Sequence, residues 1–239
     1  CPPFRVWLRS KTAANGLHRG RTLVQTGAMF VLTITQRDEA VAGDQVAHLL
    51  AALPAHEATH PLSRSWGAEV VGGVDDPATA VHLALAALRI PGSSGRRWSV
   101  GIGVGRVEQL PDGALAGPGA ARSRRAVEAA TKAHPPLGVE AGPAGVGFDG
   151  VPLAPESAAA AQATLRLIGD LVTRRSEAEW AVVDLLVPGV RGQQKAVAQS
   201  LGISVQAVSQ AVSRAQFAQE WDGRAAAALL LRLAAFAVD

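Results

Sequence analysis

The sequence predicts an α+β protein of two modules, a ferredoxin-like sheet module followed by an all-helical one. Residues 29–141 alternate β-branched runs with helical patterns in the order β-α-β-β-α-β, which is typical of a sheet with helices on one face. Residues 156–239 contain only helical patterns. Residues 142–155, between them, are rich in Gly and Pro and almost uncharged, so we interpret them as a linker.

Composition limits the class of protein. The chain has 239 residues, which suits one large or two small domains, and nearly half of them are apolar. The one cysteine, Cys1, excludes an internal disulfide or a cysteine zinc site and favours reducing, cytoplasmic surroundings. No apolar run reaches 18 residues, so we expect no membrane partner.

The basic character of the chain is concentrated at its start. Residues 1–28 hold five Lys and Arg side chains and no acid, whereas the whole chain has a net charge of +3, so the remainder is net negative. This segment precedes Met29, the only methionine, and lacks apolar periodicity. We therefore expect it to be an upstream extension, non-native or disordered, although its composition also resembles a transit peptide.

Local patterns predict each element of the first module. Residues 30–35 are β-branched and predict a strand, and Asp76 followed by Pro77 predicts the start of a helix that runs to about Leu88. The other expected elements are a helix at 46–53, strands at 61–66, 68–71 and 98–107, a helix at 120–133 and a strand at 137–140.

Two patterns in this module bear on chemistry. His56, Glu57 and His60 spell H-E-x-x-H, a zinc-protease motif that needs a long helix. Pro54 and Pro61 bracket the motif, so we interpret it as a chance occurrence in a loop and expect no metal.

Glycines form the second pattern. Gly101, Gly103 and Gly105 share one side of a predicted strand. They leave room for a ligand or for a closely packed helix, and we favour the helix because neither a P-loop nor a Rossmann fingerprint follows.

The second module is predicted to be helical throughout. A helix is expected at 156–173, and Ser176 with Glu179 forms the capping box of the next, which directs Trp180 towards the following helices. The last helix, expected at 224–238, is apolar nearly all round. Such a helix is buried within its domain or between two copies, and we expect a homodimer.

A pair of short helices is predicted at residues 194–212. Ala198 and Leu201 share the inner face of the first helix, Gly202 ends it, and Ser204 caps the second. Ile203 is expected to enter the core. The inward face of the second helix is expected to comprise Val205, Val208 and Val212.

The spacing of Ala198, Gly202 and Val208 is that of a helix-turn-helix, which places a recognition helix in the major groove of double-stranded DNA. Gln, Ser and Arg side chains hydrogen-bond base edges, and Ala contacts thymine methyl groups. The expected DNA-binding residues are Ser204, Val205, Gln206, Ala207, Ser209, Gln210, Ser213 and Arg214, with Arg191, Gln194 and Lys195 on phosphates. The alternative is an ordinary packed pair of helices.

Ahead of these helices the chain contains, in order, the stretches TITQRD, WGAEVVGGVDDPATA and RRWSVGIGVG. With the helices that follow, they resemble the SatD family over roughly residues 30–233. The resemblance implies a first module similar to nucleotide and diguanylate cyclases, where two carboxylates hold Mg²⁺ against a triphosphate. This chain departs from the pattern, with Thr35 in place of the first acid and Ala68 in place of the Asp of a Gly-Asp-Glu turn, which leaves Gly67 and Glu69. We therefore expect no metal, cofactor or catalysis there.

Together these patterns predict a cytoplasmic, sequence-specific transcriptional regulator whose first module binds a small molecule or mediates assembly. Two alternatives stay open. One is a nucleotide-binding or nucleotidyl-cyclase-like enzyme with residual chemistry at Glu69. The other is a protein-interaction module.

Overall fold

The computed structural model describes residues 28–37, 40, 43–90, 98–143 and 153–236. The extension expected at 1–28 lies outside these residues except for Ala28, and so does most of the linker expected at 142–155. No helix among the described residues has the length and apolar character needed to span a membrane.

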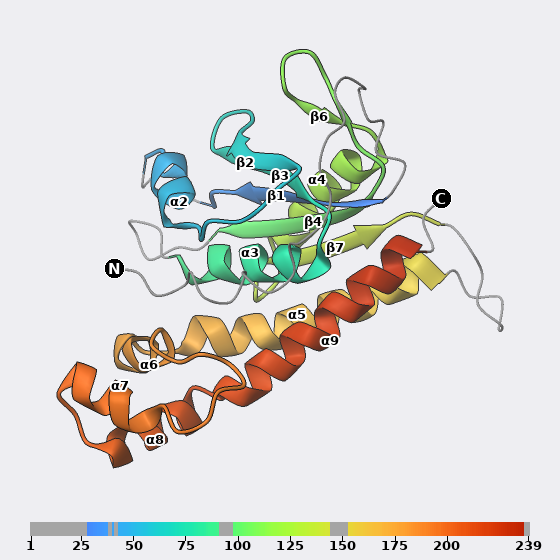
Figure 1. Ribbon diagram of the computed structural model, residues 1–239. Coiled ribbons are helices and arrows are strands. Elements are labelled where there is room, and N and C mark those ends of the chain that lie inside the picture. The colour runs from blue at the N-terminus through green and yellow to red at the C-terminus, as the bar shows by residue number, and fades with distance from the viewer. Residues whose placement is uncertain (1–27, 38–39, 41–42, 91–97, 144–152, 237–239) are drawn as a thin grey trace, which may run out of the picture.

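A five-stranded mixed sheet forms the centre of the molecule (Figure 1). The strand order is β2-β3-β1-β4-β7, with β1 antiparallel to both β3 and β4, and β4 parallel to β7. The predicted strands are confirmed with shifted ends, and the α+β class holds. The strands are β1 (Met29–Thr35), β2 (His60–Arg64), β3 (Glu69–Val74), β4 (Ser99–Gly105) and β7 (Leu137–Ala141).

Helices lie on both faces of the sheet, whereas the sequence predicted them on one. Helix α4 (Pro118–Ala130) covers one face, and α3 (Pro77–Arg89) covers the other (Figure 1). Asp76 caps α3 as predicted, since its carboxylate accepts a hydrogen bond of 2.9 Å from the Thr79 N–H. The smaller elements are α2 (Val46–Ala52), β5 (Glu108–Gln109) and β6 (Leu115–Ala116).

The glycines of β4 allow α4 to lie directly on the sheet. A Cβ atom on Gly101 would lie 2.2 Å from the Ser123 carbonyl oxygen, and one on Gly103 would lie 2.2 Å from the Gly119 carbonyl oxygen. The buried hydroxyls of Thr33 and Ser123 also hydrogen-bond across this contact, at 2.7 Å. The predicted close helix packing is therefore confirmed.

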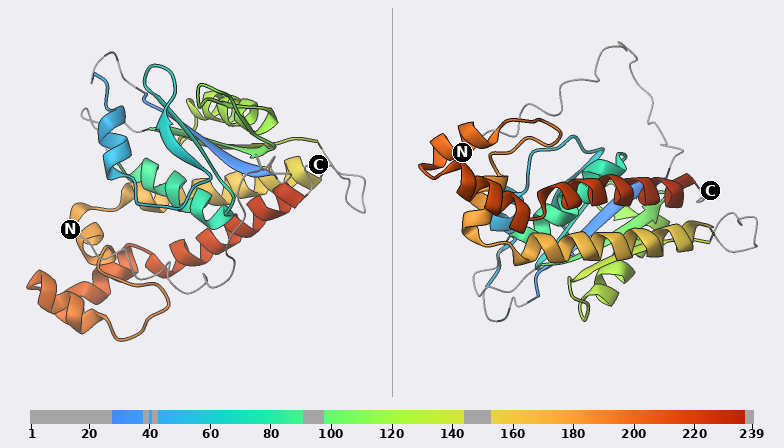
Figure 2. Two further views of the ribbon diagram at one scale, coloured as in Figure 1. Left: turned by 45° about the horizontal axis from the view of Figure 1, so that its top comes forward. Right: turned by 90° about the horizontal axis from the view of Figure 1, so that it is seen from below.

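Two long helices form a layer on the α3 face of the sheet. Helices α5 (Leu153–Arg174) and α9 (Phe217–Phe236) run antiparallel and side by side (Figure 2). Their inner sides share one hydrophobic core with the sheet and α3, through residues such as Leu165 and Leu231. Helix α9 starts earlier than predicted, and only one of its sides is buried.

Three short helices stand at one end of the α5–α9 layer (Figure 1). They are α6 (Glu177–Val183), α7 (Gln194–Leu201) and α8 (Val205–Arg214). They have a separate small core. The helical segment 156–239 is thus shared between two cores: α5 and α9 pack with the sheet, and α6–α8 pack with one another.

Candidate nucleic-acid interface

The turn between α7 and α8 is set by Gly202. This residue is left-handed, with φ of 67° and ψ of 30°, a conformation that glycine adopts without steric cost. The N–H of Ile203 donates to the Ala198 carbonyl at 3.0 Å, and that of Gly202 donates to the Gln199 carbonyl at 3.4 Å. These two bonds form a Schellman motif, so α7 ends where the sequence predicts.

Side-chain caps begin two of the three helices. The Ser204 hydroxyl accepts a hydrogen bond from the Ala207 N–H at 3.1 Å, which starts α8 as predicted. Ser176 and Glu179 form the predicted capping box of α6, with bonds of 2.9 and 3.3 Å. These local contacts fix the first turns of both helices.

The core between the three helices is small and apolar. It consists of Val182, Val197, Ala198, Val208 and Ala211, with Leu185, Leu186, Leu201 and Val212 packed at its edge. Two predicted core residues are not in it. Ile203 is 41% exposed and Val205 is 46% exposed, because both lie at the turn, before the inner face of α8 reaches α7. These two expectations are wrong.

Trp180 also differs from its prediction. Its ring lies beneath two guanidinium groups, Arg89 at 3.7 Å and Arg175 at 4.8 Å from the ring centre. It therefore packs at the junction with α3 and α5 and not against α7 and α8.

The outward face of α8 is almost entirely polar. Gln206, Ser209, Gln210 and Ser213 are exposed along it, and Ser204 is exposed at its start. Ala207 is half-buried. The face thus offers two amides and several hydroxyls on one rigid helix, which are groups that read base edges by hydrogen bonding.

Positive charge is exposed at the start of α7, the helix that packs against α8. Arg191 and Lys195 are exposed just before and within the first turn of α7, and Gln194 is half-buried there. Arg214 differs from its prediction, because its Nε lies 3.2 Å from the Glu179 carboxylate. The Ser176 backbone N–H, and then Arg214, lower the pKa of Glu179, so the carboxylate stays charged and holds Arg214.

A buried ionic cluster fixes the end of α8 to the α5–α9 layer. Arg175 donates from Nε and Nη2 to the Ala215 carbonyl, at 2.9 and 2.5 Å, directly after α8. Glu220 lies 2.5 Å from both Arg175 and Arg224, and Arg224 donates to His82 Nδ1 on α3 at 3.0 Å. No sequence pattern indicates this cluster, whose members are up to 142 positions apart.

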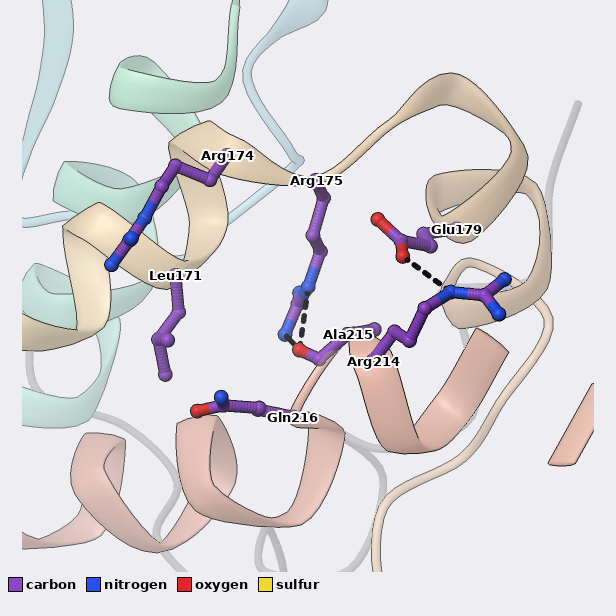
Figure 3. Close-up of a pocket in the computed structure, with 7 residues that line it drawn as sticks. All are labelled: Leu171, Arg174, Arg175, Glu179, Arg214, Ala215 and Gln216. Atoms are coloured by element: carbon purple, nitrogen blue, oxygen red, sulfur yellow. Dashed lines mark hydrogen bonds and ion pairs between the residues drawn. The ribbon is translucent and has the colours of Figure 1, made fainter. Parts of the chain in front are cut away.

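A small pocket of about 220 Å³ lies between the end of α5, the start of α6 and the segment that joins α8 to α9 (Figure 3). Arg175 reaches across it to Ala215, while Glu179 and Arg214 face each other at its other side. The pocket is smaller than the sites that hold most small-molecule ligands, which begin at about 300 Å³. We interpret it as part of the junction between α8 and the α5–α9 layer.

The residues expected at a degenerate nucleotide site are brought together. Thr35 and Glu69 lie directly opposite each other on β1 and β3, and Gly67, with φ of 54°, forms the adjoining turn. The Glu69 carboxylate lies 3.9 Å from Arg124 of α4, a pairing that a bound cation would have to displace. No group of three or more metal-ligating side chains occurs in the described part of the chain.

The H-E-x-x-H motif lies in an irregular segment. Residues 54–59 have no helical structure, and His60 begins β2. His56 Nδ1 hydrogen-bonds to the Pro54 carbonyl at 2.9 Å. The two histidines are therefore not on one helical face, and the prediction of a loop is confirmed for residues 56–59 but not for His60, which belongs to a strand.

No family model, curated protein or solved structure matches this chain.

Proposed function

We propose that α6–α8 form a helix-turn-helix and that the protein is a sequence-specific, double-stranded-DNA-binding transcriptional regulator. The observation that carries this proposal is the division of α8 into two faces. Val208 and Ala211 are buried against α7, while Gln206 and Gln210 project outward one turn apart. A Gln amide bonds adenine through two atoms, so this pair supplies sequence readout in the major groove.

The charges around α8 support the same proposal. Residues 189–219 contain three basic side chains and no acidic one, although the chain beyond residue 28 is net negative. Arg191 and Lys195 are exposed beside α7, where they reach the DNA backbone. Arg214 contributes less, because Glu179 already neutralises it. With so few cations, one copy alone binds weakly at physiological salt.

For the sheet module we propose a ferredoxin-like, cyclase-related fold that lacks metal-dependent catalysis. The order β1-α2-β2-β3-α3-β4, with β1 between β3 and β4, supports the fold. The Glu69–Arg124 contact and the Thr35 hydroxyl opposite Glu69 argue against a magnesium site. We propose that the sheet module is a regulatory or assembly domain to which α6–α8 are attached.

Selection of bound fragments from a random duplex pool tests the proposal. The parent protein is expected to enrich one short motif, whereas the double variant Gln206→Ala/Gln210→Ala, altered only at exposed positions, is expected to retain DNA without enriching it. Ser200→Ala, exposed on α7, is the control and should select the parent's motif. The absence of any enriched motif with the parent would contradict the proposal.

A further inference from the structure

The outer side of α9 carries a repeating row of exposed residues. Within the described helix, all exposed residues lie in one stripe along the helix axis. One row of residues in this stripe is spaced alternately four and three positions apart. This is the a/d spacing of a helix that packs against another helix. The row consists of Ala218, Asp222, Ala225, Leu229, Arg232 and Phe236.

Two members of this row are large, apolar and exposed. Leu229 is 53% exposed and Phe236 is 77% exposed, and Leu167 of the adjacent α5 is 73% exposed. The right-hand view of Figure 2 shows α5 and α9 on the side of the molecule that faces away from the sheet. Several large apolar side chains exposed on one side of a folded chain mark an interaction site.

The row on one α9 matches the same row on a second α9 that runs in the opposite direction. When a second α9 lies antiparallel with the two-fold axis at Ala227, Ala218 faces Phe236, Asp222 faces Arg232, and Ala225 faces Leu229. Each small side chain meets a large one, and each charge meets its opposite. In the described residues, neither Asp222 nor Arg232 forms an ion pair within its own chain.

Other arrangements lose this match. Parallel pairing places Asp222 against Asp222 and Arg232 against Arg232, and such like-charge contacts are unfavourable. A shift of one heptad in either direction separates Asp222 from Arg232 and so removes both charge pairs. We propose that the outer face of α9 binds a second copy of this chain in the antiparallel register centred on Ala227. The interface is isologous, so both copies contribute the same residues.

This register has a consequence for DNA that rests on the proposed function. Each α9 begins ten residues from Ala227, so the two helix starts are about 30 Å apart at a rise of 1.5 Å per residue. Helix α8 directly precedes each start. The two recognition helices are therefore separated by a distance comparable with one turn of DNA, about 34 Å.

Sedimentation equilibrium of the full chain without DNA tests the interface separately from DNA binding. The parent is expected to be a dimer. Asp222→Arg and Arg232→Asp each create a like-charge contact and are expected to raise the dimer dissociation constant about tenfold or more. The double variant restores both pairs and should return within about threefold of the parent. Glu128→Arg, an exposed charge reversal on α4, is the matched control and should leave the dimer unchanged.

Three outcomes overturn the inference: a monomeric parent at tens of micromolar, single reversals without effect, or a double variant no better than the singles. Both positions are exposed, so melting curves followed by circular dichroism should match the parent within a few degrees. If a charge reversal does unfold the chain, Leu229→Ala and Phe236→Ala test the interface in the same sedimentation experiment. Each is expected to weaken the dimer about tenfold, and an unchanged dimer in both would refute the interface.

Discussion

At the scale of single residues, the buried cluster of Arg175, Glu220 and Arg224 links the candidate DNA-binding helices to the rest of the protein. The side chains of Arg175 and Glu220 are each only 2% exposed. Glu220 is the one anion between two guanidinium groups, so its removal would leave two cations in a site of low polarity. The cluster therefore fixes the position of α8 while it depends on a single carboxylate.

Replacing that carboxylate provides the first prediction. Glu220→Gln is expected to lower the free energy of unfolding by about 3–5 kcal/mol, because it leaves buried charge uncompensated. The control is Asp170→Asn, which breaks the exposed pair with Arg174 and is expected to cost about 1 kcal/mol or less. Urea unfolding of both variants measures the difference. Equal losses would show that the buried cluster contributes no more than a surface pair.

His82 gives the cluster a pH dependence. Burial, and then the positive charge of Arg224, lower the pKa of His82 to about 4, from an ordinary value of about 6.5. The unfolded chain then binds a proton between pH 6.5 and 4 that the folded chain does not. The free energy of unfolding should fall over this range, by on the order of 3 kcal/mol in total.

His82→Gln tests this assignment, since Gln keeps an acceptor for Arg224 but does not titrate. The parent is expected to lose more stability than this variant between pH 7 and pH 4.5, when both are measured by urea unfolding. If the free energy of unfolding fell equally in the two proteins, groups other than His82 would cause the loss of stability in acid.

Local chemistry explains which site residues could be predicted from the sequence. Gly202, Ser204 and the Ser176–Glu179 box act on neighbours within four residues, so their roles follow from sequence spacing. The exposure of Ile203 and Val205 could not be predicted, because it depends on where α8 meets α7. The hydrogen bond from Arg175 to Ala215 could not be predicted either, because the two residues are 40 positions apart and no periodic sequence pattern links them.

At the scale of elements, the contact between α4 and β4 depends on glycine. A methyl group at Gly101 would lie 2.2 Å from a carbonyl oxygen and 2.4 Å from the Val127 backbone nitrogen, so the helix would have to move. At Gly73 a methyl group would meet only side-chain atoms, at 3.1 Å or more. Gly101→Ala is therefore expected to destabilise the protein by at least about 3 kcal/mol.

Thermal unfolding compares Gly101→Ala with Gly73→Ala, its matched control on a buried strand. Gly73→Ala should cost clearly less, because the end of Met29 can move aside. A similar loss for both would mean that α4 does not require the bare backbone of β4.

The sequence could predict most elements because their patterns are local. The strand at 30–35 and the helix after Asp76 have β-branched runs or caps that need no tertiary contact. The start of α9 could not be predicted, since Gln216, with φ of 49°, ends α8 and allows a new helix to begin at once. The division of the helices between two cores also depends on long-range packing.

At the scale of the whole molecule, α6–α8 form a small unit with its own core at one end of the α5–α9 layer. The layer continues the core of the sheet, and the ionic cluster joins it to the end of α8. We therefore expect α8, which this junction holds in place, to be the surface that recognises DNA.

The most direct test of this claim is a binding titration of Gln206→Ala and Lys195→Ala on the selected duplex and on a scrambled one. We expect Gln206→Ala to cost about 1–3 kcal/mol on the selected duplex and little on the scrambled one. Lys195→Ala is expected to weaken binding to both and to lower the salt slope by about one unit. If both variants bind both duplexes as the parent does, α7 and α8 are only a packed helical pair and the claim is contradicted.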